Sequence, residues 1–371
     1  MTARLADVVG FLEHLYPPSW AESWDAVGLV CGDPASLVHR VLFAVDPVET
    51  VVDEVVAGGY DLLVTHHPLW LGGTTSVAAT TPKGRVAHRL LAAGSALHVA
   101  HTNADVADPG VSDALAALFD LRDLRPLSPL AEPLDKLVVF VPVDDADALL
   151  EALSAAGAGA VGNYERCAWT TDGTGTFRPL TGASPAVGQV GGIEQVAESR
   201  LELVVPRARR EPVLSALRAG HPYEEPAYDL LELISLPGRR GPGRVGSLPT
   251  PMRLGELTAR AAAVLPATAW GVRTAGDPEQ LVHTLAVCGG SGDGLLGAAA
   301  GADAFLTADL RHHPASEAPE GLALLDAAHW ATEWPWLADV ARQVAAGTTV
   351  ETVVSTRVTD PWTHCARSLT A

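Results

Sequence analysis

Lysine is nearly absent from this 371-residue chain, since Lys83 and Lys136 are its only lysines. The sequence therefore has no lysine-rich tail or cluster of the kind that binds nucleic acid or anionic lipid. No apolar run approaches the ~20 residues that a membrane-spanning helix needs. The 44 acidic and 25 basic residues give a net charge of −19, which repels polyanions. We expect no general nucleic-acid binding and no association with membranes.

Cysteine is also scarce, and its four copies are widely spaced. They are Cys31, Cys167, Cys288 and Cys365. Without a C-x-x-C pair, this spacing argues against a disulfide framework and against a thiolate zinc site. The first twenty residues carry Asp7, Glu13 and His14 where a signal peptide would be apolar. We therefore expect a cytoplasmic protein that is not exported.

The length predicts two or three domains, and a hydrophobic content of 48% is typical of globular chains. The first block alternates apolar strands with helices. Strands are predicted in residues 40–47, 61–68 and 96–103, and helices in 49–59, 84–94 and 111–121. This order indicates a parallel βαβ arrangement, whose ligands bind at the carboxyl ends of the strands.

A second pattern begins near Lys136 and predicts strands and helices in two β-α-β halves separated by a Gly/Thr/Pro-rich stretch. Two such halves indicate a ferredoxin-like α+β module. The Gly- and Pro-dense residues 236–249 mark a linker. After it the first pattern returns, with strands predicted in 283–290 and 303–309 and a helix in 292–301. The expected division is 1–133 and 237–371 for one α/β domain, with 134–236 inserted.

Two adjacent histidines carry the first chemical signal. His66 and His67 close an apolar strand and precede Pro68, which favours an irregular backbone where both side chains can reach one cleft. Adjacent residues inside a strand would point to opposite faces, so only the position at the strand end makes the pair informative. A pair of metal ligands and a pair of structural histidines both fit this pattern.

Three further residues extend this signal. Asp105 follows the next predicted strand, where a helix cap would also explain it. His329 and Glu333 stand four apart, so a helix would place them on one face, although a solvated contact is the alternative. The set of His66, His67, Asp105, His329 and Glu333 suits a dinuclear site with a bridging carboxylate and open water positions.

Residues 288–294 read CGGSGDG after a predicted strand. This run does not complete G-x-G-x-x-G, and a tight strand-to-helix turn requires the same glycines. The turn is the favoured interpretation, with a contact to substrate left open.

Several segments together resemble one known family. ESWDAVGLVCGDP, LLVTHHPLW, HTNADVADPGVSDALA, AVCGGSGDGLLGAAAGADAFLTAD and LALLDAAHWATE are similar, in order and context, to the GTP cyclohydrolase I type 2 homologue family, also called the NIF-three-like family. The resemblance spans nearly the whole chain. GNYERCAWTTDGTGTFRP and HPYEEPAYD resemble the PII/CutA-like insert of its longer bacterial members.

The resemblance implies a fold with two lobes around a two-metal site, and a toroidal homohexamer. Carried over residue by residue, that site falls on the same five residues, with Glu333 as the bridging ligand. The family usually has Gly-Asp before a basic residue and a histidine in the late strand, whereas this chain has Ala308-Asp309-Leu310-Arg311. His101, Asp309 and His313 are kept as candidates for contacts to the metal ligands or the substrate, with a structural role favoured over a catalytic one, because outer partners look like ordinary polar contacts in a sequence.

The expected function is that of a metal-dependent hydrolase that acts on a small, nucleotide-like molecule. Imidazole and carboxylate ligands allow zinc, iron or manganese, two ions per chain. No separate general acid or base stands out. The alternative is a non-catalytic metal-binding or regulatory protein whose PII-like insert senses a small molecule.

Overall fold

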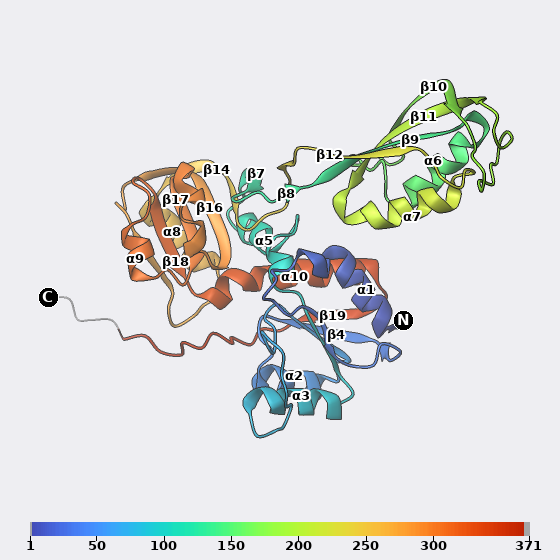
Figure 1. Cartoon of the computed structure of the whole chain (residues 1–371). Coiled ribbons are helices and arrows are strands. Elements are labelled where there is room, and N and C mark those ends of the chain that lie inside the picture. The colour runs from blue at the N-terminus through green and yellow to red at the C-terminus, as the bar shows by residue number, and fades with distance from the viewer. Residues whose placement is uncertain (1, 367–371) are drawn as a thin grey trace. The chain divides into compact units, whose positions relative to one another are not determined.

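The alternating apolar runs at the start of the chain form a five-stranded sheet in the computed structural model, which describes residues 2–366 (Figure 1). In sheet order its strands are β19 (Glu351–Val354), β4 (Arg40–Ala44), β5 (Leu62–Thr65), β6 (Ala96–Val99) and β2 (Gly28–Cys31). All neighbours are parallel except β2 and β6. The carboxyl ends of β4, β5 and β6 therefore meet at one edge, as the βαβ pattern predicts.

Helices α2 (Glu49–Gly58) and α3 (Pro82–Ala92) connect these strands. Their buried valines and leucines pack with the sheet residues in one apolar cluster. The buried residues of helix α1 (Leu5–Leu15), Leu5, Val8 and Leu12, pack in a second and larger apolar core.

A six-stranded sheet takes one strand from before the long middle segment and five from after it. Its order is β15 (Val272–Ala275), β18 (Ala323–Ala327), β17 (Ala304–Ala308), β16 (Leu281–Ser291), β14 (Arg244–Arg253) and β7 (Arg122–Pro126). Strands β16, β17 and β18 are parallel, and the outer pairings are antiparallel. Helices α4 (Thr102–Asp105), α5 (Val111–Ala117), α8 (Leu254–Val264) and α9 (His312–Ser316) complete this part.

The 19-residue helix α10 (His329–Gly347) joins the two sheets (Figure 1). It contacts β4 and β19 of the first sheet and β16 and β17 of the second. Its buried residues Trp336, Leu337 and Val340 belong to one apolar core that includes residues of both sheets. The start of α10 is held in place by this core on one side and by β18, which ends two residues before it, on the other.

The helix expected over residues 292–301 is wrong. Two short 3-10 helices, Asp293–Leu295 and Ala298–Gly301, stand there instead. Glycine lowers helix propensity by about 1 kcal/mol relative to alanine, and the segment contains four glycines.

The chain divides by contacts into two compact units, Met1–Pro129 with Arg239–Ala371, and Leu130–Gly238. The second unit has its own apolar core and a four-stranded antiparallel sheet of order β10-β11-β9-β12. Its elements are β9 (Leu134–Pro142), α6 (Ala146–Ala155), β10 (Ala168–Phe177), β11 (Glu194–Pro206), α7 (Arg210–Gly220) and β12 (Tyr228–Glu232). The chain thus runs βαββαβ through this unit.

Short strands β8 (Ala131–Glu132) and β13 (Leu236–Pro237) pair with each other where the chain enters and leaves this unit. The Gly/Thr-rich stretch of the sequence contains β10, which is exposed along most of its length.

Among the described residues, no helix combines the length and apolar character needed to cross a bilayer.

Candidate metal centre

Strand and helix ends bring the candidate residues together in the unit formed by 2–129 and 239–366. His66 and His67 follow β5, Asp105 ends α4 after β6, and His329 and Glu333 lie in the first turns of α10. Parallel strands end at the same edge, so the first three are neighbours through the sheet register. The α10 residues reach them because α10 packs across both sheets.

Glu333 is the centre of the cluster and is only 3% exposed. Its Oε1 lies 2.9 Å from His329 Nε2 and 3.4 Å from His66 Nε2. Its Oε2 lies 3.1 Å from His67 Nε2. Asp105 Oδ1 is 3.6 Å from His66 Nε2. The structure therefore brings all five sequence-predicted residues to one point, with one carboxylate facing three imidazoles.

Each of these imidazoles is oriented by an acceptor on its outer side. His66 Nδ1 donates to the Ala100 carbonyl at 2.9 Å, and His67 Nδ1 donates to Asp46 Oδ1 at 2.7 Å. His329 Nδ1 donates to Asp309 Oδ2 at 2.7 Å. Because carbonyls and carboxylates only accept, the proton lies on Nδ1 in each neutral ring. The Nε2 lone pairs are thereby left free to face the centre, as in protein metal sites.

Asp46 was missed by the sequence reasoning, although a signal for it exists. It stands two residues after the end of β4, at the same strand edge as His67, in a segment where Pro47 ends the regular backbone. The structure also shows its Oδ2 accepting a hydrogen bond from the Thr359 hydroxyl. This second bond comes from a residue more than three hundred positions away, which no local pattern could predict.

The buried charges of the cluster stabilise one another. Burial alone would lower the pKa of His67, but the carboxylates of Glu333 and Asp46 outweigh it and raise that pKa to about 10. Burial is likewise outweighed at His329, whose pKa Glu333 and Asp309 raise to about 11. Burial opposes ionisation of Glu333 too, yet the imidazoles hold its pKa well below the usual range. Without a metal, the His67 and His329 rings therefore also carry a proton on Nε2, the atom that would bind a cation.

Gly290, at the end of β16, makes room for the Glu333 carboxylate. Its φ of +67° lies in the left-handed region. A Cβ on this residue would lie 2.4 Å from Glu333 Oε1 and 3.0 Å from His329 Nε2. The Gly290 N–H donates to the Thr332 hydroxyl at 2.9 Å, which ties this turn to α10. The CGGSGDG turn thus has a role at the cluster itself.

The residues fit a divalent cation. His66 Nε2 and Glu333 Oε2 are buried and have no hydrogen-bond partner among residues 2–366. Two ligand triplets have their donor atoms within 4.8 Å of one another: His66 with His67 and His101, and His67 with His329 and Glu333. Imidazole nitrogens and carboxylate oxygens suit zinc, iron and manganese.

The three additional candidates differ in their positions. His101 faces the rings of His66 and His67, with centroids 5.1 and 5.5 Å away, and its Nδ1 donates to Asp25 at 2.9 Å. Burial lowers the pKa of His101 to about 4, so this ring is neutral. Asp309 contacts His329 directly, as described above. His313 contacts its chain neighbours in and beside α9: its ring faces that of His312, and its carbonyl accepts from the Ser316 hydroxyl and the Glu317 N–H.

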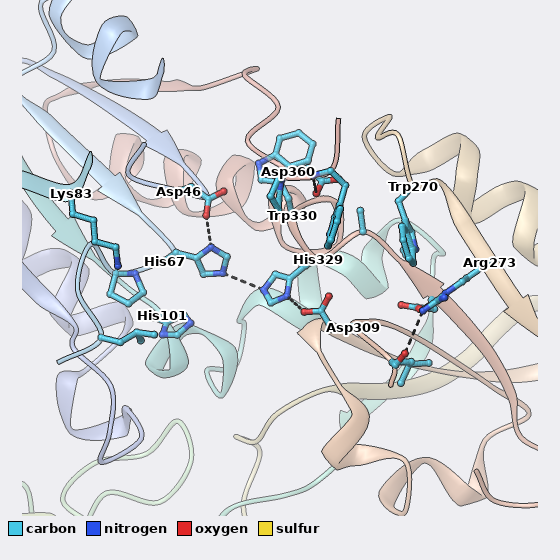
Figure 2. A pocket seen from close by; sticks show the side chains of 18 residues that line it. Asp46, His67, Lys83, His101, Trp270, Arg273, Asp309, His329, Trp330 and Asp360 are labelled. Carbon is cyan, nitrogen blue, oxygen red and sulfur yellow. Dashed lines mark hydrogen bonds and ion pairs between the residues drawn. The ribbon is translucent and has the colours of Figure 1, made fainter. Parts of the chain in front are cut away.

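A cavity of about 720 Å³ opens beside the cluster (Figure 2). His67, His101 and His329 lie on its wall together with Asp46, Lys83 and Asp309. Farther from His67, Figure 2 shows Trp270 and Arg273. This volume falls in the range of small-molecule sites.

Comparison with known proteins places these features in a family. The family model described as Duf34/NIF3 (NGG1p interacting factor 3) matches residues 3–361. A Mycobacterium leprae protein named "GTP cyclohydrolase 1 type 2 homolog" is 51% identical over 375 residues, covering 99% of this chain and 97% of that protein. A Bacillus subtilis protein of the same name is 37% identical, covering 87% of each chain.

Solved structures agree with the sequence matches. A Bacillus cereus protein related to NIF3 superposes with a TM-score of 0.85 at 33% identity, covering 98% of this chain and 99% of that one. A Staphylococcus aureus protein superposes with a TM-score of 0.80 at 28% identity and the same coverage. The family model and these relatives span nearly all of the chain, and it therefore belongs to the Duf34/NIF3 family.

Proposed function

We propose that this protein binds two divalent metal ions at the cluster and hydrolyses a small, nucleotide-like substrate. The observation that carries the proposal is the Glu333 carboxylate, whose two oxygens face different imidazoles. Oε1 faces His329 and His66, and Oε2 faces His67. A carboxylate that faces ligands on both sides is arranged to be shared between two cations, with His66, His67, Asp105 and His329 as the remaining ligands.

When bound, divalent ions in such sites lower the pKa of water and polarise the substrate. The chain itself supplies orientation. Asp46 and Asp309 fix the His67 and His329 rings, so ligand geometry does not have to form at the moment of binding. His101 is a neutral imidazole whose Nδ1 proton is held by Asp25, which leaves Nε2 as an acceptor near the reacting groups.

A nucleotide-like substrate is supported by the size of the cavity and by the relatives. The cavity of about 720 Å³ is larger than two metal ions would need, and its volume is that of a site for a small organic molecule. Relatives at 51% identity carry the name "GTP cyclohydrolase 1 type 2 homolog". GTP is therefore the first compound to test, within a wider panel of nucleotides and phosphate esters.

The test measures metal content and turnover together. We expect close to two divalent ions per chain in protein from its native host, and hydrolysis that stops with a chelator and returns with the matched metal. Glu333→Gln should lose metal more readily than His101→Ala, with the exposed Glu225→Gln as the matched control. His67→Ala should lower turnover at least ~100-fold. Full metal occupancy in Glu333→Gln would contradict the shared carboxylate.

We also propose that residues 134–236 are an inserted PII/CutA-like domain and that the chain assembles as a homohexamer. The βαββαβ order and the separate apolar core support the first part. A second cavity of about 240 Å³ in this unit, lined by Phe140, Phe177 and Tyr223, supports a sensing role for it.

If a broad screen finds no metal-dependent turnover, a regulatory metal-binding protein becomes the better description. Light scattering tests the assembly.

A further inference from the structure

Two indole rings lie exposed in the cavity beside the metal centre. Trp270 precedes β15 and is 36% exposed, and Trp362 follows β19 and is 62% exposed. Both line the cavity, with ring centroids 6.4 Å apart and planes inclined by 35°. Large aromatic surfaces are usually buried, so two wet indoles facing one cavity point to a ligand that covers them.

Trp270 is held from one side by Arg273. The Arg273 guanidinium lies 4.6 Å from the Trp270 ring centroid, and its Nε donates to Asp326 Oδ2 at 2.6 Å. Arg273 and Asp326 face each other across the β15–β18 pairing. Rigid strands therefore fix the Arg273–Trp270 stack, and a ligand need not order it.

Asp360 adds a polar group to the wall of the same cavity. Its Oδ1 accepts the Trp362 N–H at 3.2 Å, which fixes the backbone next to the indole. Asp360 is only 7% exposed and lines the cavity, yet its Oδ2 has no hydrogen-bond partner in the described part of the chain. A buried acceptor without a donor is costly, and a ligand N–H would satisfy it.

We propose that Trp270, Trp362 and Asp360 form a subsite for a planar heteroaromatic ring that carries N–H donors, as a guanine-type purine does. The ring stacks on the indoles, and its donor edge meets Asp360 Oδ2. This inference rests on the proposed function, because the ring would belong to the substrate that reaches the metal centre. It adds to that function the residues that recognise the ring and the chemistry that they select.

An ammonium ligand would also suit indoles beside a carboxylate. Arg273 disfavours it, because a cation already lies over Trp270 and would repel a second one. A plain hydrocarbon would leave Asp360 Oδ2 without a donor. A planar ring with N–H donors satisfies both the aromatic faces and the acceptor.

The experiment measures nucleoside binding by calorimetry on the full-length protein after metal removal. Guanosine should bind, and purine riboside, which has the same ring system without the exchangeable N–H groups, should bind at least ~5-fold more weakly. Trp362→Leu should weaken guanosine binding roughly tenfold or more, the scale of losing one stacked base, and Trp362→Phe should retain most of it. Trp169→Leu removes an indole of similar exposure, 57% against 62%, from β10 and should change nothing.

Asp360→Ala should abolish the preference for guanosine over purine riboside while both still bind. The inference is overturned if guanosine does not bind, if it binds no better than purine riboside, if Trp362→Leu binds it as the parent protein does, or if tetramethylammonium binds more tightly. Because the assay needs neither metal nor turnover, failure of the hydrolase screen with binding intact would reject only the hydrolysis.

Discussion

Replacing Gly290 by alanine should remove metal binding while leaving the fold in place. The left-handed backbone at this position, φ +67°, costs an L-residue about 1–2 kcal/mol. The new methyl group would also lie 2.4 Å from Glu333 Oε1. The Glu333 side chain can retreat only by leaving the three imidazoles that it faces. We expect a metal affinity at least ~100-fold lower. Losing a residue that hydrogen-bonds to a metal ligand costs up to about 100-fold in affinity, and here a metal ligand itself is displaced.

Two glycines provide matched controls for this variant. Gly321 has a φ of +83° and open space around its Cβ position, so Gly321→Ala imposes the backbone cost without the clash. Gly297 has open space and a φ of −63°, so Gly297→Ala imposes neither.

The assay combines thermal unfolding with metal competition against a chromogenic chelator. Gly290→Ala and Gly321→Ala should both lower the Tm of the metal-free protein, by roughly 2–8 °C. Only Gly290→Ala should lose the metal, and Gly297→Ala should behave as the parent protein. If Gly290→Ala held metal with unchanged affinity, the Glu333 carboxylate would not be the shared ligand at this centre.

Three further expectations follow from the same geometry. Asp46→Asn should lower metal affinity about 10–100-fold, because the His67 ring loses its charged acceptor; an unchanged affinity in the competition assay would show that the ring is held by other contacts. Metal affinity should rise from pH 6 to pH 9, because the pKa values of His67 and His329, raised to about 10 and about 11, keep protons on the rings that a cation must displace; a flat profile would contradict this. Replacing residues 134–236 by a short Gly/Ser linker should leave a folded protein that still binds metal, as judged by circular dichroism and metal analysis, since every candidate ligand lies in the flanking unit; an unfolded or metal-free product would place this segment in the core.

Local patterns marked the five central residues as candidates, with a structural role left open for each of them. His66 and His67 follow an apolar strand at its end, where an irregular backbone lets both side chains reach one cleft. The spacing of one helical turn places His329 and Glu333 on one face of α10. The same holds for the alternating strands and helices of the first block, whose apolar runs are buried on both faces. The helix expected at 292–301 failed because four glycines there outweigh the apolar spacing.

The tertiary structure alone decided which of these pairs meet and what surrounds them. The packing of α10 against both sheets brings Glu333 to His66 and His67 across more than two hundred and sixty residues. Gly290 looks like any turn glycine until Glu333 lies against it. Trp270 and Trp362 share a cavity only because the segment before β15 and the segment after β19 lie near each other. Sequence periodicity indicates on which face of its own helix or strand a side chain lies. Contacts between distant elements depend instead on how whole apolar faces pack, and the residues that form those faces are spread over the entire chain.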